Sequence, residues 1–162
     1  MEWFAREGTS DFLLDLVLLV RTGVKIAVHK YFALPFRLQG QGLAPLLLTP
    51  FNTQYKAASI AQIELTTAKS IGAYVWAVSG FCAIDKQEVA TILKIGRLRD
   101  TRTVLALHYA VYQAFYDADA DGTPFPMRLP ATLAGGKTLL KNNVWQGVLR
   151  LSDKEQTATF QS

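Results

Sequence analysis

The stretch from residue 56 to residue 84 carries the clearest periodic pattern in the chain. Small residues recur there eleven positions apart in two series, Ala57, Ala68, Ser79 and Ala61, Gly72, Ala83. Eleven residues make close to three turns of an α-helix, so each series stays on nearly one face of a straight helix. We therefore predict one long helix over 56–84, with a face of small residues that lets another backbone approach closely.

Composition favours a protein with part of its surface covered by a neighbour. The 162 residues suit one domain, and 50% of them are hydrophobic while 19% are charged. Soluble domains carry about 25% charged residues. Between Tyr31 and Ile63 the only charged residues are Arg37 and Lys56. We interpret this as surface that faces protein or lipid, although a compact and merely hydrophobic domain remains the alternative.

The N-terminal part predicts a basic amphipathic helix over about 10–33. Its polar residues Arg21, Lys25 and His29 lie four apart, with Lys30 beside them. On a helix they form one basic stripe, which is typical of contact with an anionic surface. A helix half-buried in protein with a basic wet face is the alternative. The net charge of +4 is compatible with either interpretation.

The start of the chain does not resemble a secretory signal. Glu2, Glu7 and Asp11 stand where such a signal would be positively charged, so we expect an intracellular or organellar protein. The single cysteine, Cys82, excludes an internal disulfide and a zinc site built from several cysteines. Because Cys82 lies in an apolar run, we predict a buried side chain.

Residues 36–52 predict an irregular connector, since Gly and Pro recur in them. The connector carries an apolar group of three residues, Leu46, Leu47 and Leu48, which needs cover from the fold or from a partner. Residues 70–84 contain no charge, and we interpret them as a buried helix, with a membrane span as the alternative.

Two further helices follow. Asp85 caps the first, with Glu88 as its capping-box partner, and this helix ends near Gly96. The second runs over about 103–116 and contains His108, which we interpret as a core or boundary side chain. Basic residues gather between the two helices, where they cap a helix end or contact an anionic surface: Lys94, Arg97, Arg99 and Arg102.

The fold that these patterns predict is mainly α. About four helices form a single domain over 1–162, with a helical core at about 10–116 and an acidic loop and C-terminal arm at 117–162. In the arm, residues 144–151 have strand propensity and residues 157–160 form a candidate second strand, so the arm is irregular or a two-stranded hairpin.

The sequence AFYDADADGT at the end of the aromatic helix resembles the first half of an EF-hand. The resemblance implies Ca²⁺ ligands at Asp117, Asp119 and Asp121 and a sharp turn at Gly122. The second half differs, because Arg128 stands where the family has its bidentate glutamate. A Ca²⁺ site is therefore an alternative, with a solvated acidic loop as the other interpretation.

Two shorter motifs also resemble known families. Residues 119–123, DADGT, resemble the nucleophile motif of the haloacid-dehalogenase phosphatases, but here the motif follows a predicted helix instead of a strand. Residues 131–138, ATLAGGKT, resemble a Walker A loop with alanine in place of the first glycine. No strand is predicted before this loop, so we interpret it as a Gly-Gly turn.

The function that we predict is that of a non-catalytic structural or accessory subunit of a larger, membrane-associated assembly. Its partners are other protein subunits in a hetero- or homo-oligomer; nucleic acid is not expected, because no base-reading module is present. The residues expected to contact a partner are Leu46, Leu47, Leu48, Ala61, Ala68 and Gly72. No cofactor is expected apart from Ca²⁺ in one alternative, and a small enzyme with an unrecognised site is the other alternative.

Overall fold

The protein has an α/β fold. The computed structural model describes residues 13–33, 35–38, 41, 43–67, 71–97, 102–118 and 122–161. Within these residues six strands form one mixed sheet in the order β1-β2-β3-β6-β4-β5. The prediction of a mainly α fold with about four helices is therefore wrong.

The chain divides into two compact units, which are described separately. Unit 1 comprises Met1–Leu65 and Arg150–Ser162, and unit 2 comprises Thr66–Leu149. That the two units form a single domain over 1–162, as expected from the sequence, stays a prediction.

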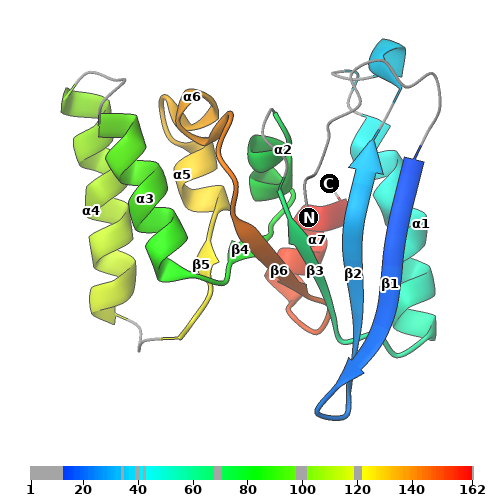
Figure 1. Ribbon diagram of the computed structural model, residues 1–162. Helices are drawn as coiled ribbons and strands as arrows, with labels where there is room; N and C mark the ends of the chain where they lie inside the picture. The colour runs from blue at the N-terminus through cyan, green and yellow to red at the C-terminus, as the bar shows by residue number, and fades with distance from the viewer. Residues whose placement is uncertain are drawn as a thin grey trace. The chain divides into compact units, whose positions relative to one another are not determined.

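Unit 1 begins with a β-hairpin (Figure 1). It is followed by a short 3-10 helix, a long helix and a strand, and the chain returns to unit 1 with a C-terminal helix: β1 (Leu13–Arg21), β2 (Val24–Ala33), η1 (Phe36–Leu38), α1 (Leu43–Ala57), β3 (Gln62–Thr66) and α7 (Lys154–Gln161). Strands β1 and β2 are antiparallel, whereas β2 and β3 are parallel and joined through α1. Helices α1 and α7 contact each other.

The hairpin replaces the basic helix that we predicted over about 10–33. Thr22 and Gly23 both have positive φ angles, 49° and 80°, as a two-residue hairpin turn of type I′ requires. The turn reverses the chain, so Arg21, Lys25 and His29 do not form a helical stripe. Arg21 instead pairs with Glu64 of β3, with 2.9 Å between Nη1 and Oε1. The predicted cap at Ser10 or Asp11 lies outside the described residues.

The long helix predicted over 56–84 is also absent. Ser59, with a φ of 58°, turns the chain after α1, and residues 62–66 form β3. Their burial alternates along the strand, with Ile63 and Leu65 buried and their neighbours more exposed. The small residues spaced eleven apart therefore lie in several elements and do not share one helix face. Residues 43–52, part of the irregular connector predicted over 36–52, instead belong to α1. Pro45 lies in the first turn of this helix, where its missing N–H costs nothing.

Unit 2 contains most of the helices. Its elements are α2 (Gly72–Val78), β4 (Cys82–Ala83), α3 (Lys86–Arg97), α4 (Arg102–Ala118), β5 (Phe125–Pro126), α5 (Arg128–Thr132), α6 (Gly136–Leu140) and most of β6 (Gln146–Arg150). Strand β4 pairs antiparallel with both β5 and β6. Helices α3 and α4 are close to the predicted ones and lie side by side (Figure 1).

The C-terminal arm is a compact part of the fold. The predicted strand at 144–151 is β6, but residues 157–160 belong to α7 and not to a second strand. Asp153 caps this helix, because its carboxylate accepts the backbone N–H of Gln156 at 3.1 Å. Phe160 is 1% exposed and anchors the helix.

Residues 70–84, which we had considered as a membrane span, take another form. Their described part divides between α2 and β4, with Gly80 at a φ of 94° between them. None of the helices within the described residues has the length and hydrophobicity that crossing a bilayer requires. The single buried helix predicted over 70–84 is therefore replaced by a short helix and a strand, and the alternative of a membrane span is not supported within the described residues.

A buried polar pair joins the sheet of unit 1 to its helix. His29 of β2 is 3% exposed, and its Nε2 lies 2.7 Å from the hydroxyl oxygen of Tyr55 in α1. Burial lowers the pKa of His29 to about 4 and raises the pKa of Tyr55 to about 12. Both side chains are therefore neutral at pH 7.

We predict that acid destabilises unit 1 through His29. Between pH 6.5 and about pH 4 the unfolded chain binds a proton at His29 and the folded chain does not, so the free energy of unfolding falls as the pH falls. The loss across this window is on the order of 3 kcal/mol. Denaturant titrations from pH 7 to pH 4 measure it. His29→Gln should show a flatter pH dependence, whereas Tyr55→Phe, which keeps the buried imidazole, should keep the wild-type slope. Equal slopes in all three proteins would contradict the assignment.

Candidate functional site

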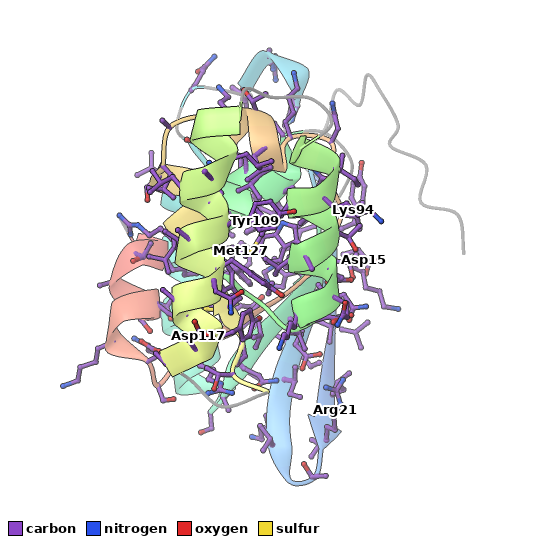
Figure 2. The ribbon with its side chains drawn as sticks, turned by 90° about the vertical axis from the view of Figure 1, so that its left-hand side faces the viewer. Asp15, Arg21, Lys94, Tyr109, Asp117 and Met127 are labelled. Carbon is purple, nitrogen blue, oxygen red and sulfur yellow. The ribbon has the colours of Figure 1, made fainter. Side chains whose placement is uncertain are left out.

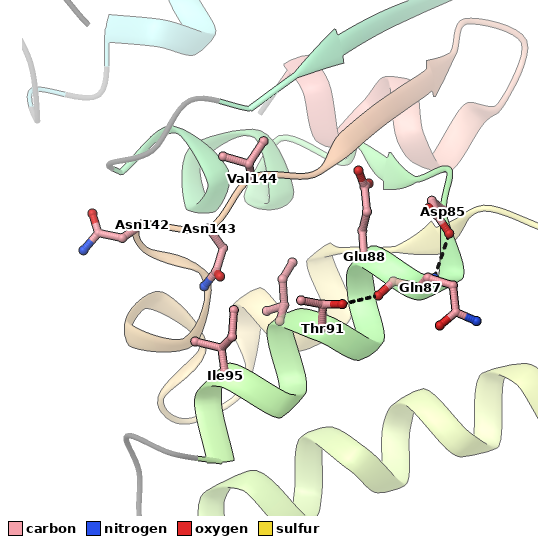
Figure 3. A pocket seen from close by; sticks show the side chains of 9 residues that line it. Asp85, Gln87, Glu88, Thr91, Ile95, Asn142, Asn143 and Val144 are labelled. Atoms are coloured by element: carbon pink, nitrogen blue, oxygen red, sulfur yellow. Dashed lines mark hydrogen bonds between the residues drawn. The ribbon is translucent and has the colours of Figure 1, made fainter. Parts of the chain in front are cut away.

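An open cavity of about 460 Å³ lies in unit 2 between the first turns of α3 and the segment that leads into β6 (Figure 3). It is lined by Asp85, Gln87, Glu88, Thr91, Ile92, Ile95, Asn142, Asn143 and Val144. Several polar side chains line the cavity, so its chemistry decides whether this part of unit 2 carries a reactive site.

The α3 side of the cavity consists of groups that complete the start of the helix. The Asp85 carboxylate accepts the backbone N–H of Gln87 at 2.8 Å, which confirms the predicted cap. The Thr91 hydroxyl donates to the carbonyl oxygen of Gln87 at 2.8 Å. Glu88 differs from the capping-box prediction, because its carboxylate accepts the backbone N–H of Gln146 in β6 at 2.8 Å. Glu88 thus fixes the strand to the helix.

The opposite side is formed by a turn with internal hydrogen bonds. Asn142 has a φ of 65°, a left-handed conformation that asparagine tolerates. The buried Asn143 donates from Nδ2 to the carbonyl oxygen of Leu139 at 2.7 Å. The buried hydroxyl of Thr67 accepts the N–H of Trp145 at 3.0 Å and donates to the Asn143 carbonyl oxygen at 3.5 Å. These bonds hold the segment in place.

The cavity lining offers hydrogen-bonding groups but no catalytic pair. Its two carboxylates already accept backbone N–H groups, and no His, Cys, Lys or Arg stands among the lining residues. Within the described residues no three His, Cys, Asp or Glu side chains gather in a way that suits a metal ion. The cavity can accommodate a small polar molecule, but it presents neither a nucleophile with a base nor a charge-stabilising cation.

The proposed Ca²⁺ ligands are only partly within the described residues. Asp117 lies in the last turn of α4, is exposed and accepts a hydrogen bond from Nε2 of Gln113 at 2.8 Å. Asp119 and Asp121 lie outside the described residues. Gly122 has a φ of 103°, consistent with a sharp turn. Ca²⁺ binding stays a prediction.

The described residues among those expected to contact a partner differ in burial and belong to different elements. In α1, Leu46 is 69% exposed whereas Leu48 is 1% exposed, and the side chain of Leu47 is outside the described part. Ala61 is exposed in unit 1 and Gly72 is half-buried in unit 2, and Ala68 lies outside the described residues. Their role in packing against a partner stays a prediction. The long helix over 56–84 that was expected to carry three of them is absent.

The basic residues expected to contact an anionic surface belong to different elements. Lys25 donates from Nζ to the carbonyl oxygen of Ala58 at 3.2 Å, and Lys30 is exposed on β2. Arg97 ends α3 and Arg102 begins α4, but the side chains of both lie outside the described part. Arg99 lies outside the described residues altogether. Contact of these residues with an anionic surface stays a prediction.

His108 and the aromatic side chains near it belong to the core of unit 2. His108 is 2% exposed, and its Nε2 lies 3.0 Å from the carbonyl oxygen of Ala134. Phe125 packs on the rings of three residues of α4, Tyr112, Phe115 and Tyr116. Burial raises the pKa of Tyr112, while nearby Lys86 acts in the opposite direction. These groups fill space and do not line the open cavity.

The Gly-Gly segment does not form a Walker A loop. A helix, α5, precedes it where that family has a strand, and Gly135 makes a turn with a φ of 75°. At Gly136 an added Cβ would overlap the backbone carbonyl oxygen of Pro130 and lie 2.7 Å from that of Ala131. The glycine thus permits α5 and α6 to approach closely, which supports the interpretation as a turn.

Within the described residues β1 has a free edge, a feature that sequence reasoning missed. Strand β1 ends the sheet, and its Leu18 and Val20 are 59% and 67% exposed. The signal was the dipeptide Thr22-Gly23 between two runs rich in Val, Leu and Ile, which is typical of a hairpin. The same residues also fit a basic amphipathic helix, and that assignment excluded a strand with a free edge.

Comparison of the chain with protein-family models, with curated proteins and with solved structures found no significant match.

We predict that Gly136→Ala destabilises the protein by about 2 kcal/mol or more, because the methyl group meets backbone that cannot yield cheaply. Gly72→Ala is the matched control: no atom lies within 4 Å of its Cβ position, and alanine favours the helix by up to about 1 kcal/mol. Denaturant unfolding measures both. Equal stabilities for the two variants would contradict the close approach at Gly136.

Proposed function

We propose that this protein is a non-catalytic structural or accessory subunit of a larger protein assembly, and that it associates through the free edge of β1. The observation that carries the proposal is the position of β1, nine residues long, at the end of the sheet, with Leu18 and Val20 exposed. Such an edge offers unpaired backbone groups to another strand, which is the basis of association by β-augmentation.

The direction of the edge groups follows from one hydrogen bond. The carbonyl oxygen of Lys25 in β2 accepts the N–H of Ala61, just before β3, at 2.9 Å. In an antiparallel pair the N–H and C=O of one residue point to the same side, so those of Lys25 point away from β1. Its partner Val20 is thus in a non-hydrogen-bonded pair, and the backbone groups of Val20 point to the free edge.

The same alternation applies along β1. Leu18 and Leu16 follow Val20 at intervals of two, so their N–H and C=O groups also face outward. Apart from the β1–β2 ladder, no backbone hydrogen bond links β1 to another described residue. Each of these three residues therefore offers one backbone N–H donor and one C=O acceptor to an added strand.

The side chains of the edge lack the features that normally prevent association. Between Asp15 and Arg21 the strand has five apolar residues with neither a charge nor a proline. Edges of monomeric sheets are usually protected by such residues or by bulges. The one bulge in this hairpin lies at Asp15/Leu16, near the beginning of the strand.

The small-enzyme alternative has less support. The open cavity of unit 2 holds two carboxylates that already bond backbone N–H groups, and the buried His108 bonds a backbone carbonyl. The exposed edge, in contrast, has backbone groups and apolar side chains that an added strand would satisfy. An interaction role accounts for more of the described surface.

We predict that Val20→Lys dissociates the protein from its assembly, because a lysine on the edge opposes burial against another strand. In native extracts the wild-type chain should migrate in a particle heavier than its own 17.9 kDa. The Val20→Lys chain should migrate at the mass of the monomer. Size-exclusion chromatography with detection of the tagged chain measures this.

Two exposed leucines provide controls for that experiment. Leu107 in α4 is 47% exposed, and Leu107→Lys should leave the particle intact. Leu46→Lys tests the surface first expected from the sequence. If Leu46→Lys releases the chain and Val20→Lys does not, the assembly surface is on α1 and the edge proposal is wrong.

A further inference from the structure

We propose that the strand added to β1 is β1 of a second copy of this chain. The two strands are antiparallel and related by a two-fold axis at Leu18. This inference rests on the proposed function and adds the partner and the register. A two-fold contact requires one patch that is complementary to itself, so each copy of β1 must fit its own reverse.

The backbone fits this arrangement. With the axis at Leu18, that residue faces its own copy and Leu16 faces Val20 of the other strand. These three residues are the ones whose N–H and C=O groups point to the free edge. Each facing pair exchanges two hydrogen bonds, so about six new bonds join the strands. Because these three residues pair only with one another, every outward N–H and C=O group between positions 16 and 20 has a hydrogen-bond partner.

The charges select the same register. Asp15 and Arg21 lie at opposite ends of β1 and are each three residues from Leu18, so Asp15 of one copy faces Arg21 of the other (Figure 2). Asp15 is exposed and has no ion pair with another described residue. Arg21 uses Nη1 and Nη2 for Glu64, but its side chain is 58% exposed and its guanidinium has further N–H donors.

Neighbouring registers lose this match. With the axis at Val17, Asp15 faces Leu19 and Arg21 faces Leu13, so both charges lie opposite leucines. With the axis at Leu19, Asp15 faces the turn residue Gly23 and Arg21 faces Val17. Those two axes thus offer no ion pair, whereas the axis at Leu18 offers two.

The apolar side chains fit as well. Leu16, Leu18 and Val20 share one face of the hairpin, because they alternate along the strand. Opposite them on β2 are His29, Ala27 and Lys25, and the first two are buried. Pairing two copies brings these apolar side chains together in one strip, which covers the 59% exposed Leu18 and the 67% exposed Val20.

Disulfide cross-linking tests the register. In Leu18→Cys the two introduced cysteines have Cα atoms about 5.5 Å apart, within disulfide range. In Val20→Cys the two introduced cysteines are offset by four residues along the strands, about 13 Å, and cannot form a disulfide. Both variants retain the buried Cys82, so it is common to the comparison. Under mild oxidation Leu18→Cys should form a covalent dimer and Val20→Cys should remain monomeric on non-reducing gels.

A charge exchange tests the ion pairs. Asp15→Arg places arginine opposite arginine, and Arg21→Asp places aspartate opposite aspartate, so each variant alone should dimerise at least about tenfold more weakly than the wild type. Mixing the two restores opposite charges at both ends and should restore the dimer. The mixed sample still lacks the pair of Arg21 with Glu64 in one chain, so its recovery cannot come from that pair. Analytical ultracentrifugation measures all three samples.

The failures of the two proposals differ. If the purified chain is a monomer at all concentrations while Val20→Lys still releases it from a heavier particle in extracts, the edge binds a different protein and the homodimer is wrong. If Val20→Cys cross-links as well as Leu18→Cys, or if mixing gives no recovery, the register is wrong. If neither the purified chain nor the extract responds to Val20→Lys, both proposals fail.

Discussion

The two-residue turn at Thr22 and Gly23 is the constraint from which the organisation of unit 1 follows. Its positive φ angles fix the register of β1 against β2, and this register decides which residues of each strand point inward. Lys25 then presents its carbonyl oxygen to Ala61, so that the chain after α1 is aligned with β2. The same alternation turns the backbone groups of Val20 outward. A single turn thus determines both the parallel pairing with β3 and the unpaired edge.

The two units differ in how their polar groups are satisfied. In unit 2 the polar residues around the open cavity bond to backbone: Glu88 fixes β6, Asp85 caps α3 and Asn143 holds the turn before Trp145. These bonds account for the residues structurally and leave little chemistry. In unit 1 the buried His29 and Tyr55 bond each other, whereas the outer edge of β1 has no backbone partner among the described residues. The outer edge of β1 therefore offers backbone donors and acceptors, whereas the two carboxylates of the cavity already accept backbone N–H groups.

Sequence reasoning succeeded where the signal was local. Helices α3 and α4 and strand β6 have caps or patterns of their own, and Asp85 caps α3 as expected. It failed where pairing between distant segments decides the structure. The leucine-rich run of β1 suits a helix or a strand equally, and only its pairing across Thr22 and Gly23 makes it a strand. Residues 62–66 become β3 because β2 lies beside them, and the spacing of small residues in the sequence carries no information on that partner. Thr22-Gly23 was a local signal for the hairpin, but no local signal places β1 at the end of the sheet, because the exposure of Val20 depends on the order of the strands.

The most direct test of the account is amide hydrogen exchange of β1, followed by NMR at increasing protein concentration. The account predicts that the amides of Leu16, Leu18 and Val20 exchange quickly in dilute protein and slowly when two copies pair. The amides of Val17 and Leu19, which face β2, should be slow at every concentration. Fast exchange of the three edge amides at all concentrations, or protection that persists on dilution to the monomer, would contradict the pairing of two copies through this edge.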